Sequence, residues 1–369
     1  MSELRVARDE NIGTPKHRRD SSCNDAHLPL AGQGAFRALA MISRRKASDL
    51  LAVLISVAVA AIGLELLTRF VADDGMQFDL EMWKYARDVK QVSADPLIGH
   101  EHAPNRHAFL MGVDFRTNSR GLRDREFGDA RVPGKLRILM LGDSLTVGWG
   151  VPVEDTFSKR IERLYAAEGV EAEAINLGVG NYNTTQEVES FLTAGRQYRP
   201  DIVVLNFFVN DAEELAPTKP PSALMRHCYA CVFVAGRIDA LTRRFFGGQD
   251  WASYYLGLYG DGSSKGWLDA KAAIKRLADY CRENNITLLV ASLPELHDVA
   301  HYRFDPITDL VRAAAAQNGA AFVDVLPYLK DQPSSSLWVT APDPHPNAFA
   351  NAFIAQGLFD ALRKLPAKP

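Results

Sequence analysis

One stretch of the sequence, from Leu50 to Thr68, limits what this chain can fold into more than any other, because its only charged residue is Glu65. A helix needs about 20 apolar residues to cross a bilayer, so this stretch is just long enough. A basic run at 44–46 precedes it. The positive-inside tendency therefore places the N-terminus in the cytoplasm and the chain after about residue 70 on the other side. We predict an uncleaved, single-pass transmembrane anchor over residues 47–70.

Two alternatives compete with the anchor. A signal peptide could be cleaved after Ala58-Val59-Ala60, although the apolar character continues past that point. A helix buried in a globular core would be expected to show a polar face, which the uncharged run 50–64 lacks. Residues 1–46 are expected to form a cytoplasmic, disordered tail. Since the sequence from Met41 resembles a natural start, residues 1–40 are either part of that tail or an over-extended start.

The charge balance argues against nucleic acid as a partner. The 369 residues contain 42 Lys and Arg against 45 Asp and Glu, a net charge of -3. Residues 1–46 hold nine basic and five acidic side chains, or +4, which leaves -7 for the remainder. A general nucleic-acid-binding protein needs a basic surplus to neutralise phosphates. We therefore interpret the basic stretch as a topology determinant next to anionic lipid.

Four cysteines, Cys23, Cys228, Cys231 and Cys281, are too few for a disulfide scaffold. A structural zinc site needs four ligands, and the Cys228-x-x-Cys231 motif has no second pair to complete one. We expect a local disulfide or unpaired thiols at this motif.

Beyond the anchor, the sequence predicts an α/β domain. Residues 71–134 are rich in turn-forming pairs and form a juxtamembrane, hairpin-like preface to it. Continuously apolar strands that alternate with amphipathic helices imply a parallel sheet covered by helices on both faces. This pattern covers residues 135–365. The expected strands are 136–142, 171–178, 201–208, 286–294 and 320–325, and the expected helices are 156–169, 184–197, 268–283, 307–317 and 347–363.

An insertion at residues 212–266 interrupts this alternation and is rich in aromatic side chains. One interpretation is a small helical flap that packs its own apolar side. The other is a lid over an acyl or glycan pocket, because long connections at the carboxyl ends of parallel strands are common ligand sites. The two interpretations are compatible.

The first strand of the domain ends in Gly142-Asp143-Ser144-Leu145-Thr146. A tight turn between a strand and a helix lifts a side chain above the sheet edge, where backbone N–H groups can stabilise an oxyanion. Ser144 is therefore a candidate nucleophile. The motif is neither a G-x-S-x-G elbow, since Thr146 replaces the second glycine, nor a phosphate-binding loop.

A lone histidine precedes the last helix, in Asp343-Pro344-His345-Pro346-Asn347. A histidine is a general base near neutral pH when a carboxylate holds its tautomer, and Asp343 is the candidate carboxylate. A doubly wound sheet brings its first and last loops to the same edge, so we expect His345 to lie close to Ser144.

Two further loops supply candidate oxyanion donors. Asn210 follows the third strand and offers a side-chain amide, and Asp211 beside it is placed to brace the loop. The loop 176–184, after the second strand, offers backbone N–H groups, since Gly and Asn tolerate left-handed conformations.

These four loops, in this order, resemble the SGNH or GDSL hydrolase family, with a serine block at 142–146, a glycine block at 176–184, an asparagine block at 210–211 and a final block at 343–345. The preface resembles that of membrane-anchored bacterial members in its runs 118–123, 137–139 and 148–151. The resemblance implies a three-layer α/β/α fold with a flavodoxin-like parallel sheet. It also implies a catalytic set of Ser144, His345 and Asp343, and an oxyanion hole formed by Asn210 with Gly180 or Asn181.

Three positions depart from the family pattern. The asparagine block usually has Gly two residues before Asn, where this chain has Phe208. Ungapped alignment places the oxyanion glycine at Asn181, with Gly180 one position early. The acid is commonly three residues before the histidine, which is Pro342 here, whereas Asp343 is two before.

The resemblance implies a serine esterase or acyl hydrolase that cleaves O-acyl or O-acetyl esters and needs no metal or organic cofactor. The substrate would be an ester-bearing molecule such as a glycan or a lipid. With the anchor prediction, the enzyme would sit in a bacterial inner membrane with its catalytic domain on the periplasmic, extracytoplasmic side. An O-acyltransferase acting on an exported polysaccharide and a non-catalytic glycan-binding or assembly protein are the alternatives. The sequence does not indicate an oligomeric state.

Overall fold

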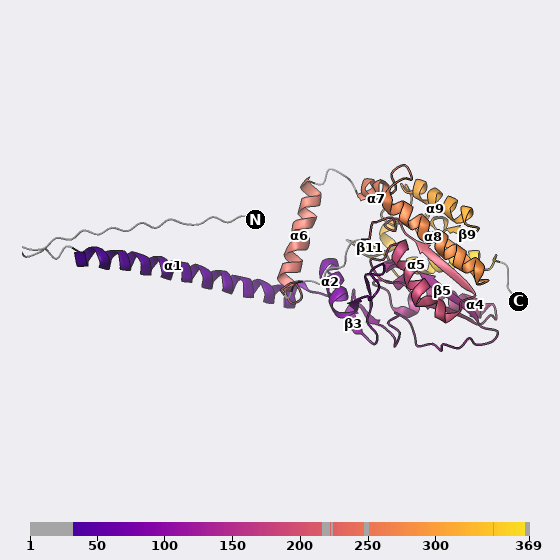
Figure 1. Ribbon diagram of the computed structural model, residues 1–369, viewed down its shortest axis with the longest axis horizontal. Coiled ribbons are helices and arrows are strands. Elements are labelled where there is room, and N and C mark those ends of the chain that lie inside the picture. Colours follow the sequence, from indigo (N-terminus) through magenta and orange to yellow (C-terminus); the bar gives the residue numbers. More distant parts are fainter. Residues whose placement is uncertain (1–31, 216–221, 223, 247–250, 342, 366–369) are drawn as a thin grey trace, which may run out of the picture. The chain divides into compact units, whose positions relative to one another are not determined.

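The computed structural model describes residues 32–215, 222, 224–246, 251–341 and 343–365 (Figure 1). Contacts divide the chain into two units, residues 1–62 and 63–369. The second unit contains the sheet, its covering helices and the segments that precede the sheet.

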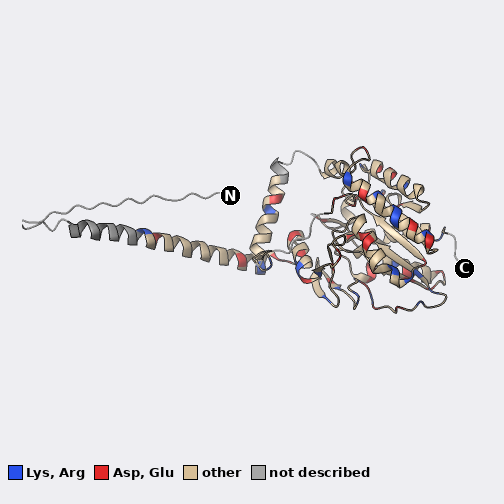
Figure 2. Ribbon diagram, in the orientation of Figure 1, with Lys and Arg blue, Asp and Glu red and all other residues tan. Residues whose placement is uncertain are grey.

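The first helix, α1 (Gly32–Leu67), starts well before the predicted anchor, so the predicted boundary at residue 47 lies inside a helix. Ala, Leu and Arg between residues 36 and 46 favour helix and account for this extension. The rest of the predicted tail, residues 1–31, lies outside the described residues. In the described chain, one helical stretch, Lys46–Ala72, is long and apolar enough to cross a membrane, a property that anchors and signal sequences share. Figure 2 shows no charged residue between Asp49 and Glu65.

A five-stranded parallel sheet forms the centre of the second unit, with the strand order β6-β5-β7-β8-β9. The strands are β5 (Leu136–Leu141), β6 (Ala172–Asn176), β7 (Ile202–Phe207), β8 (Thr287–Ser292) and β9 (Ala321–Asp324). Ile138 of β5 lies opposite Ala174 on one side and Ile202 on the other. The first strand of the sheet in the sequence is therefore β5. The next strand, β6, lies on one side of β5, and β7, β8 and β9 follow in order on the other side. The predicted parallel flavodoxin-like sheet is confirmed.

Helices cover both faces of this sheet (Figure 1). Successive residues of β5 point to opposite faces, so Leu139 joins one buried cluster and Ile138 the other. One face is covered by α4 (Phe157–Ala167) and α10 (Ala348–Leu362), and the other by α5 (Thr184–Thr193), α8 (Lys265–Glu283) and α9 (Asp305–Gln317).

The segment before the sheet forms one helix and two antiparallel hairpins. The elements are α2 (Phe78–Asp88), β1 (Lys90–Val92) paired with β2 (His100–His102), and β3 (His107–Leu110) paired with β4 (Val113–Arg116). Tyr85, Phe115 and Trp149 are buried together in one apolar cluster. Since Trp149 follows β5, this cluster packs the segment against the end of the sheet where the polar loops emerge.

The insertion contributes α6 (Tyr229–Phe246) and α7 (Trp251–Tyr259). The Glu65 carboxylate accepts the N–H groups of Tyr229 and Ala230, at 3.1 and 2.8 Å, which satisfies donors at the N-terminus of α6. Helix α7 buries Tyr259 in the core, as the interpretation of a helical flap expects. Cys228 and Cys231 form a disulfide.

Candidate active site

The turn after β5 is built around Gly142 and Asp143. Gly142 has a φ of +157°, and a Cβ there would lie 1.9 Å from Oγ1 of Thr146, so a larger residue would clash. The Asp143 side chain caps the short helix α3 (Ser144–Val147) by accepting the N–H of Leu145 at 2.9 Å. Ser144 therefore starts a helix at the carboxyl end of β5, an inner strand of the sheet, with 8% of its surface exposed.

Ser144, His345 and Asp343 form a connected set. His345 Nε2 lies 2.8 Å from Ser144 Oγ, and His345 Nδ1 lies 2.5 Å from Asp343 Oδ1. The same carboxylate oxygen accepts the backbone N–H of His345 at 3.1 Å, a local turn that an aspartate two residues earlier makes readily. Thus Asp343, two positions before the histidine, reaches the ring despite its departure from the family spacing.

The charges within this set favour an imidazole that accepts a proton. Burial lowers the pKa of His345, but the charge and hydrogen bond of Asp343, with the charge of Asp143, raise it above the ordinary 6.5. Burial raises the pKa of Asp343. The charge of His345 and the hydrogen bonds that Asp343 accepts outweigh burial and bring this pKa below the ordinary 3.8. An ionised Asp343 fixes the proton of a neutral His345 on Nδ1, which leaves Nε2 free to accept the Ser144 proton.

Asn210 lies in the turn after β7, the strand beside β5, and its side chain lies near the carboxyl of Asp143, where it acts against the larger effect of burial that raises the pKa of Asp143. Asp211 braces this turn, because its Oδ2 accepts the Phe208 N–H and the Thr184 hydroxyl, each at 3.1 Å. The structure therefore brings Asn210 to the residue next to Ser144, where an amide can donate to an oxyanion.

Gly180 and Asn181 lie in the loop after β6, which approaches the end of β5 where Val179 N donates to Gly142 O at 3.1 Å. The Gly180 N–H donates to Oη of Tyr85 at 2.9 Å, so this candidate donor already has a buried partner. Asn181 is exposed and has a φ of +66°, a left-handed conformation that Asn tolerates.

The sequence of this domain matches a known family. The model of the family described as "GDSL-like Lipase/Acylhydrolase family" matches residues 140–352, more than half of the chain. The chain belongs to this family. It is accordingly a GDSL-family esterase or acylhydrolase, as the four loops indicate. No curated protein matches the chain.

Several solved structures match the chain at low sequence identity. "TesA" is 13% identical over 62% of this chain and 98% of its own, with a TM-score of 0.41. The psychrotrophic esterase EstA from Pseudoalteromonas sp. is 16% identical over 62% of this chain and 97% of its own, with a TM-score of 0.39. An acetylxylan esterase from Geobacillus stearothermophilus is 12% identical over 62% of this chain and 94% of its own, with a TM-score of 0.41.

Three residues that contact the site were not predicted as part of it. Trp149 Nε1 donates to Asp343 Oδ2 at 3.1 Å, and the ring of Phe78 lies over that of His345 with centroids 6.1 Å apart. Arg123 is buried and donates to carbonyls of the segment after Ser144. Trp149 and Arg123 lie in the runs that resemble membrane-anchored members of the GDSL family, which is the signal that could have indicated them. Phe78 has no such signal.

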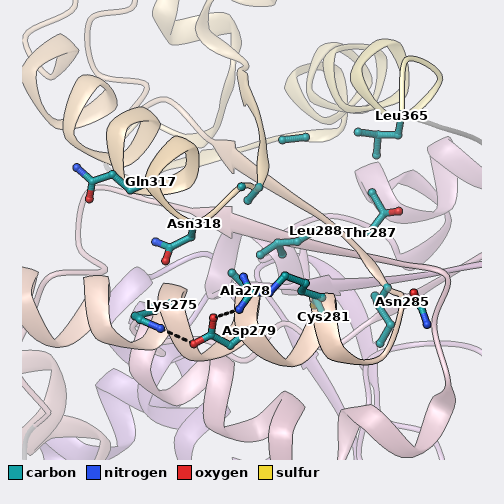
Figure 3. A pocket seen from close by; sticks show the side chains of 15 residues that line it. Lys275, Ala278, Asp279, Cys281, Asn285, Thr287, Leu288, Gln317, Asn318 and Leu365 are labelled. Atoms are coloured by element: carbon teal, nitrogen blue, oxygen red, sulfur yellow. Dashed lines mark hydrogen bonds and ion pairs between the residues drawn. The ribbon is translucent and has the colours of Figure 1, made fainter.

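A cavity of about 750 Å³ lies elsewhere in the domain (Figure 3). Its lining includes Thr287 and Leu288, at the start of β8, and Asn318, which follows α9. This is the amino end of the parallel strands, whereas Ser144 lies at the carboxyl end. The cavity and the group of Ser144, His345 and Asp343 therefore lie at opposite ends of the strands.

Proposed function

We propose that this GDSL-family chain is a membrane-anchored serine esterase that cleaves O-acyl esters, O-acetyl esters among them, through Ser144, His345 and Asp343. Ser144 Oγ attacks the ester carbonyl while His345 Nε2 takes the serine proton, and the tetrahedral oxyanion receives hydrogen bonds from Asn210 and a backbone N–H. Collapse of this intermediate expels the alcohol, which takes the proton from His345. Water, activated by the same histidine, then hydrolyses the acyl-enzyme.

The observation that carries this proposal is the continuous hydrogen-bonded path from Ser144 Oγ through both ring nitrogens of His345 to the Asp343 carboxylate, with links of 2.8 and 2.5 Å. A serine hydroxyl is a weak nucleophile on its own and needs an adjacent, oriented base. The path supplies both the base and the carboxylate that orients it.

Two features support a catalytic domain outside the cytoplasm. The basic run 44–46 precedes the apolar stretch Lys46–Ala72, which by the positive-inside tendency places the later residues across the membrane. The Cys228–Cys231 disulfide suits an oxidising compartment such as the bacterial periplasm. An alkaline phosphatase fused to the C-terminus is expected to be active in a bacterial host, and an inactive fusion would contradict this orientation.

Reaction of the full-length protein with a fluorophosphonate probe tests the mechanism. We expect the wild type to be labelled and Ser144→Ala not to be, because the probe reacts with an activated serine. Ser190→Ala, which changes a serine on α5 away from the site, is the matched control and should be labelled like the wild type. An unlabelled wild type would exclude the proposed mechanism and favour a non-catalytic glycan-binding or assembly protein.

The fate of the acyl group separates a hydrolase from a transferase. The proposed esterase releases acetate from p-nitrophenyl acetate at the same rate as p-nitrophenol, with or without an added polysaccharide. Acetate that appears on the polysaccharide instead of in solution would show an O-acyltransferase.

A further inference from the structure

The loop after β6 is held by a buried and a half-buried side chain from the segment before the sheet, and the mechanism above assigns these side chains no role. Tyr85 of α2 accepts the Gly180 N–H at 2.9 Å. Lys90 of β1 donates from Nζ to the Gly180 carbonyl oxygen at 2.6 Å. The two peptide units that flank the Gly180 Cα are therefore both tied to this preceding segment.

We propose that Lys90 and Tyr85 are positioning residues, which hold the Gly180 peptides so that the Asn181 N–H donates to the oxyanion formed at Ser144. The proposal rests on the serine-esterase function proposed above. It assigns a catalytic purpose to the segment before the sheet, whose helix and hairpin supply both residues.

The geometry of the peptide bond connects Lys90 to the Asn181 N–H. The Gly180 carbonyl and the Asn181 N–H belong to one planar trans unit, in which the C=O and N–H bonds point in opposite directions. Because Lys90 Nζ fixes the carbonyl, the N–H is directed away from Lys90. The Asn181 side chain gives a second attachment, since its Oδ1 lies 3.0 Å from the same Nζ.

The hydrogen bonds around Lys90 Nζ hold the peptide between Gly180 and Asn181 in place. Nζ of Lys90 donates to Gly180 O and to Asn181 Oδ1, and His100 Nε2, which lies 3.2 Å from Nζ, lies 3.1 Å from the same Gly180 carbonyl oxygen. Burial lowers the pKa of Lys90 to about 7, and burial with the charge of Lys90 lowers the pKa of His100 to about 4, so the neutral His100 ring is a second N–H donor to the Gly180 carbonyl. A donor at the carbonyl end of a peptide also polarises it and makes its N–H a better donor.

Tyr85 removes Gly180 as a competing donor. Its hydroxyl lies 2.5 Å from His102 Nε2, and burial lowers the pKa of His102 to about 3. The neutral His102 ring therefore accepts a hydrogen bond from the tyrosine hydroxyl. The tyrosine oxygen is then left to accept the Gly180 N–H. With that N–H engaged, the exposed Asn181 supplies the backbone donor of this loop.

Steady-state kinetics of full-length Lys90→Met tests the proposal, because methionine keeps the length of the side chain and removes its N–H donors. With p-nitrophenyl acetate we expect kcat to fall by about 10- to 100-fold, since a misplaced group in an active site costs up to about 100-fold, while KM stays near its wild-type value. With the thiono analogue of this ester, the negative charge develops on sulfur, which is a weak hydrogen-bond acceptor. The fall in kcat caused by Lys90→Met should therefore be smaller with the thiono ester. Gln91→Met is the control, since it removes only a hydrogen bond from β1 to Glu101 and should keep kcat.

The outcomes separate the two proposals. If the fluorophosphonate probe labels the wild type and Lys90→Met keeps the wild-type kcat, the positioning role is wrong and the esterase function stands. An equal fall in kcat with the oxygen ester and the thiono ester would also contradict the positioning role, because the defect would then not involve the oxyanion. If Lys90→Met does not fold, Tyr85→Phe decides in the same way, since it removes only the hydroxyl that binds Gly180. An unlabelled wild type would refute the esterase function itself.

Discussion

The Nε2 atom of His345 lies 2.8 Å from the Oγ of Ser144, although 201 positions separate the two residues in the sequence. The parallel sheet makes this contact possible, because Ser144 follows the inner strand β5 and His345 precedes α10, which packs against the sheet beside α4. Asn210, after the neighbouring strand β7, completes the group. The switch in strand order beside β5 thus brings together loops from distant parts of the chain.

The pH dependence of esterase activity should report the coupling between His345 and Asp343. Only the neutral imidazole accepts a proton, and Asp343 raises the pKa of His345 above 6.5, so the acid limb of kcat/KM should have its midpoint above pH 6.5. In Asp343→Asn the opposing effect of burial remains, so the midpoint should move to lower pH. We expect kcat to fall by about 10⁴-fold as the histidine tautomer is no longer fixed.

Asp331→Asn, at an exposed site, controls for the change of charge and should reproduce the wild-type profile. An Asp343→Asn profile with an unshifted midpoint would mean that another group holds His345.

The sequence was sufficient to predict the sheet, because its inner strands β5, β7 and β8 are buried on both faces and are therefore largely apolar. The run 136–142 became β5 at Leu136–Leu141, for example. Ser144 and His345 were predictable because each stands in a short motif at the end of an element. Helix α2 was missed, since it is short and lies in a stretch rich in charged and turn-forming residues. The contacts of Tyr85 and Lys90 with Gly180 carry no local signal, because they form only when segments about 90 residues apart pack together.

Trp149 should act on catalysis through Asp343. Its indole N–H donates to Asp343 Oδ2, and this bond helps to lower the pKa of that carboxyl. In Trp149→Phe we expect kcat to fall by about tenfold with KM unchanged, as one hydrogen bond to a charged group is worth about 1.5 kcal/mol or more. Trp338→Phe is the matched control, because its half-buried indole N–H donates to the Leu296 carbonyl instead. Equal losses of kcat in both variants would show a general packing defect and exclude a specific role for Trp149.

Arg123 should stabilise the segment that follows Ser144. Its guanidinium is buried and donates to the carbonyls of Val147 at 2.8 Å, Val151 at 2.6 Å and Gly148. Arg123→Met removes the hydrogen bonds to the Val147 and Val151 carbonyls, while the Gly148 carbonyl keeps the Val151 N–H, and we expect the free energy of unfolding to fall by about 3 kcal/mol or more in urea denaturation. Arg123→Lys should recover part of this loss, since a single ammonium cannot match the fork of a guanidinium.

Arg120→Met is the control for Arg123, as it removes ion pairs at the protein surface and should cost less than about 1 kcal/mol. A loss of similar size in both arginine variants would contradict the structural role of Arg123.

Glu187 of α5 should destabilise the fold at neutral pH. Its side chain is buried, and neither carboxylate oxygen has a hydrogen-bond partner among the residues that the structure describes. Burial, with the nearby charges of Asp211 and Asp143, raises the pKa of Glu187 well above the ordinary 4.5. Above pH 4.5 the unfolded chain therefore loses this proton while the folded chain retains it. Stability then falls by about 1.4 kcal/mol per pH unit until the folded pKa is reached.

Glu187→Gln removes this titration and nearly preserves the shape of the side chain. We expect its Tm to exceed that of the wild type at pH 7.5, and the difference to shrink toward zero as the pH falls to 4.5. Glu189→Gln, on the same helix, loses the ion pair with Arg276 and should show no such gain. A Glu187→Gln variant that is less stable than the wild type at pH 7.5 would mean that the carboxylate is ionised and stabilised in the folded protein.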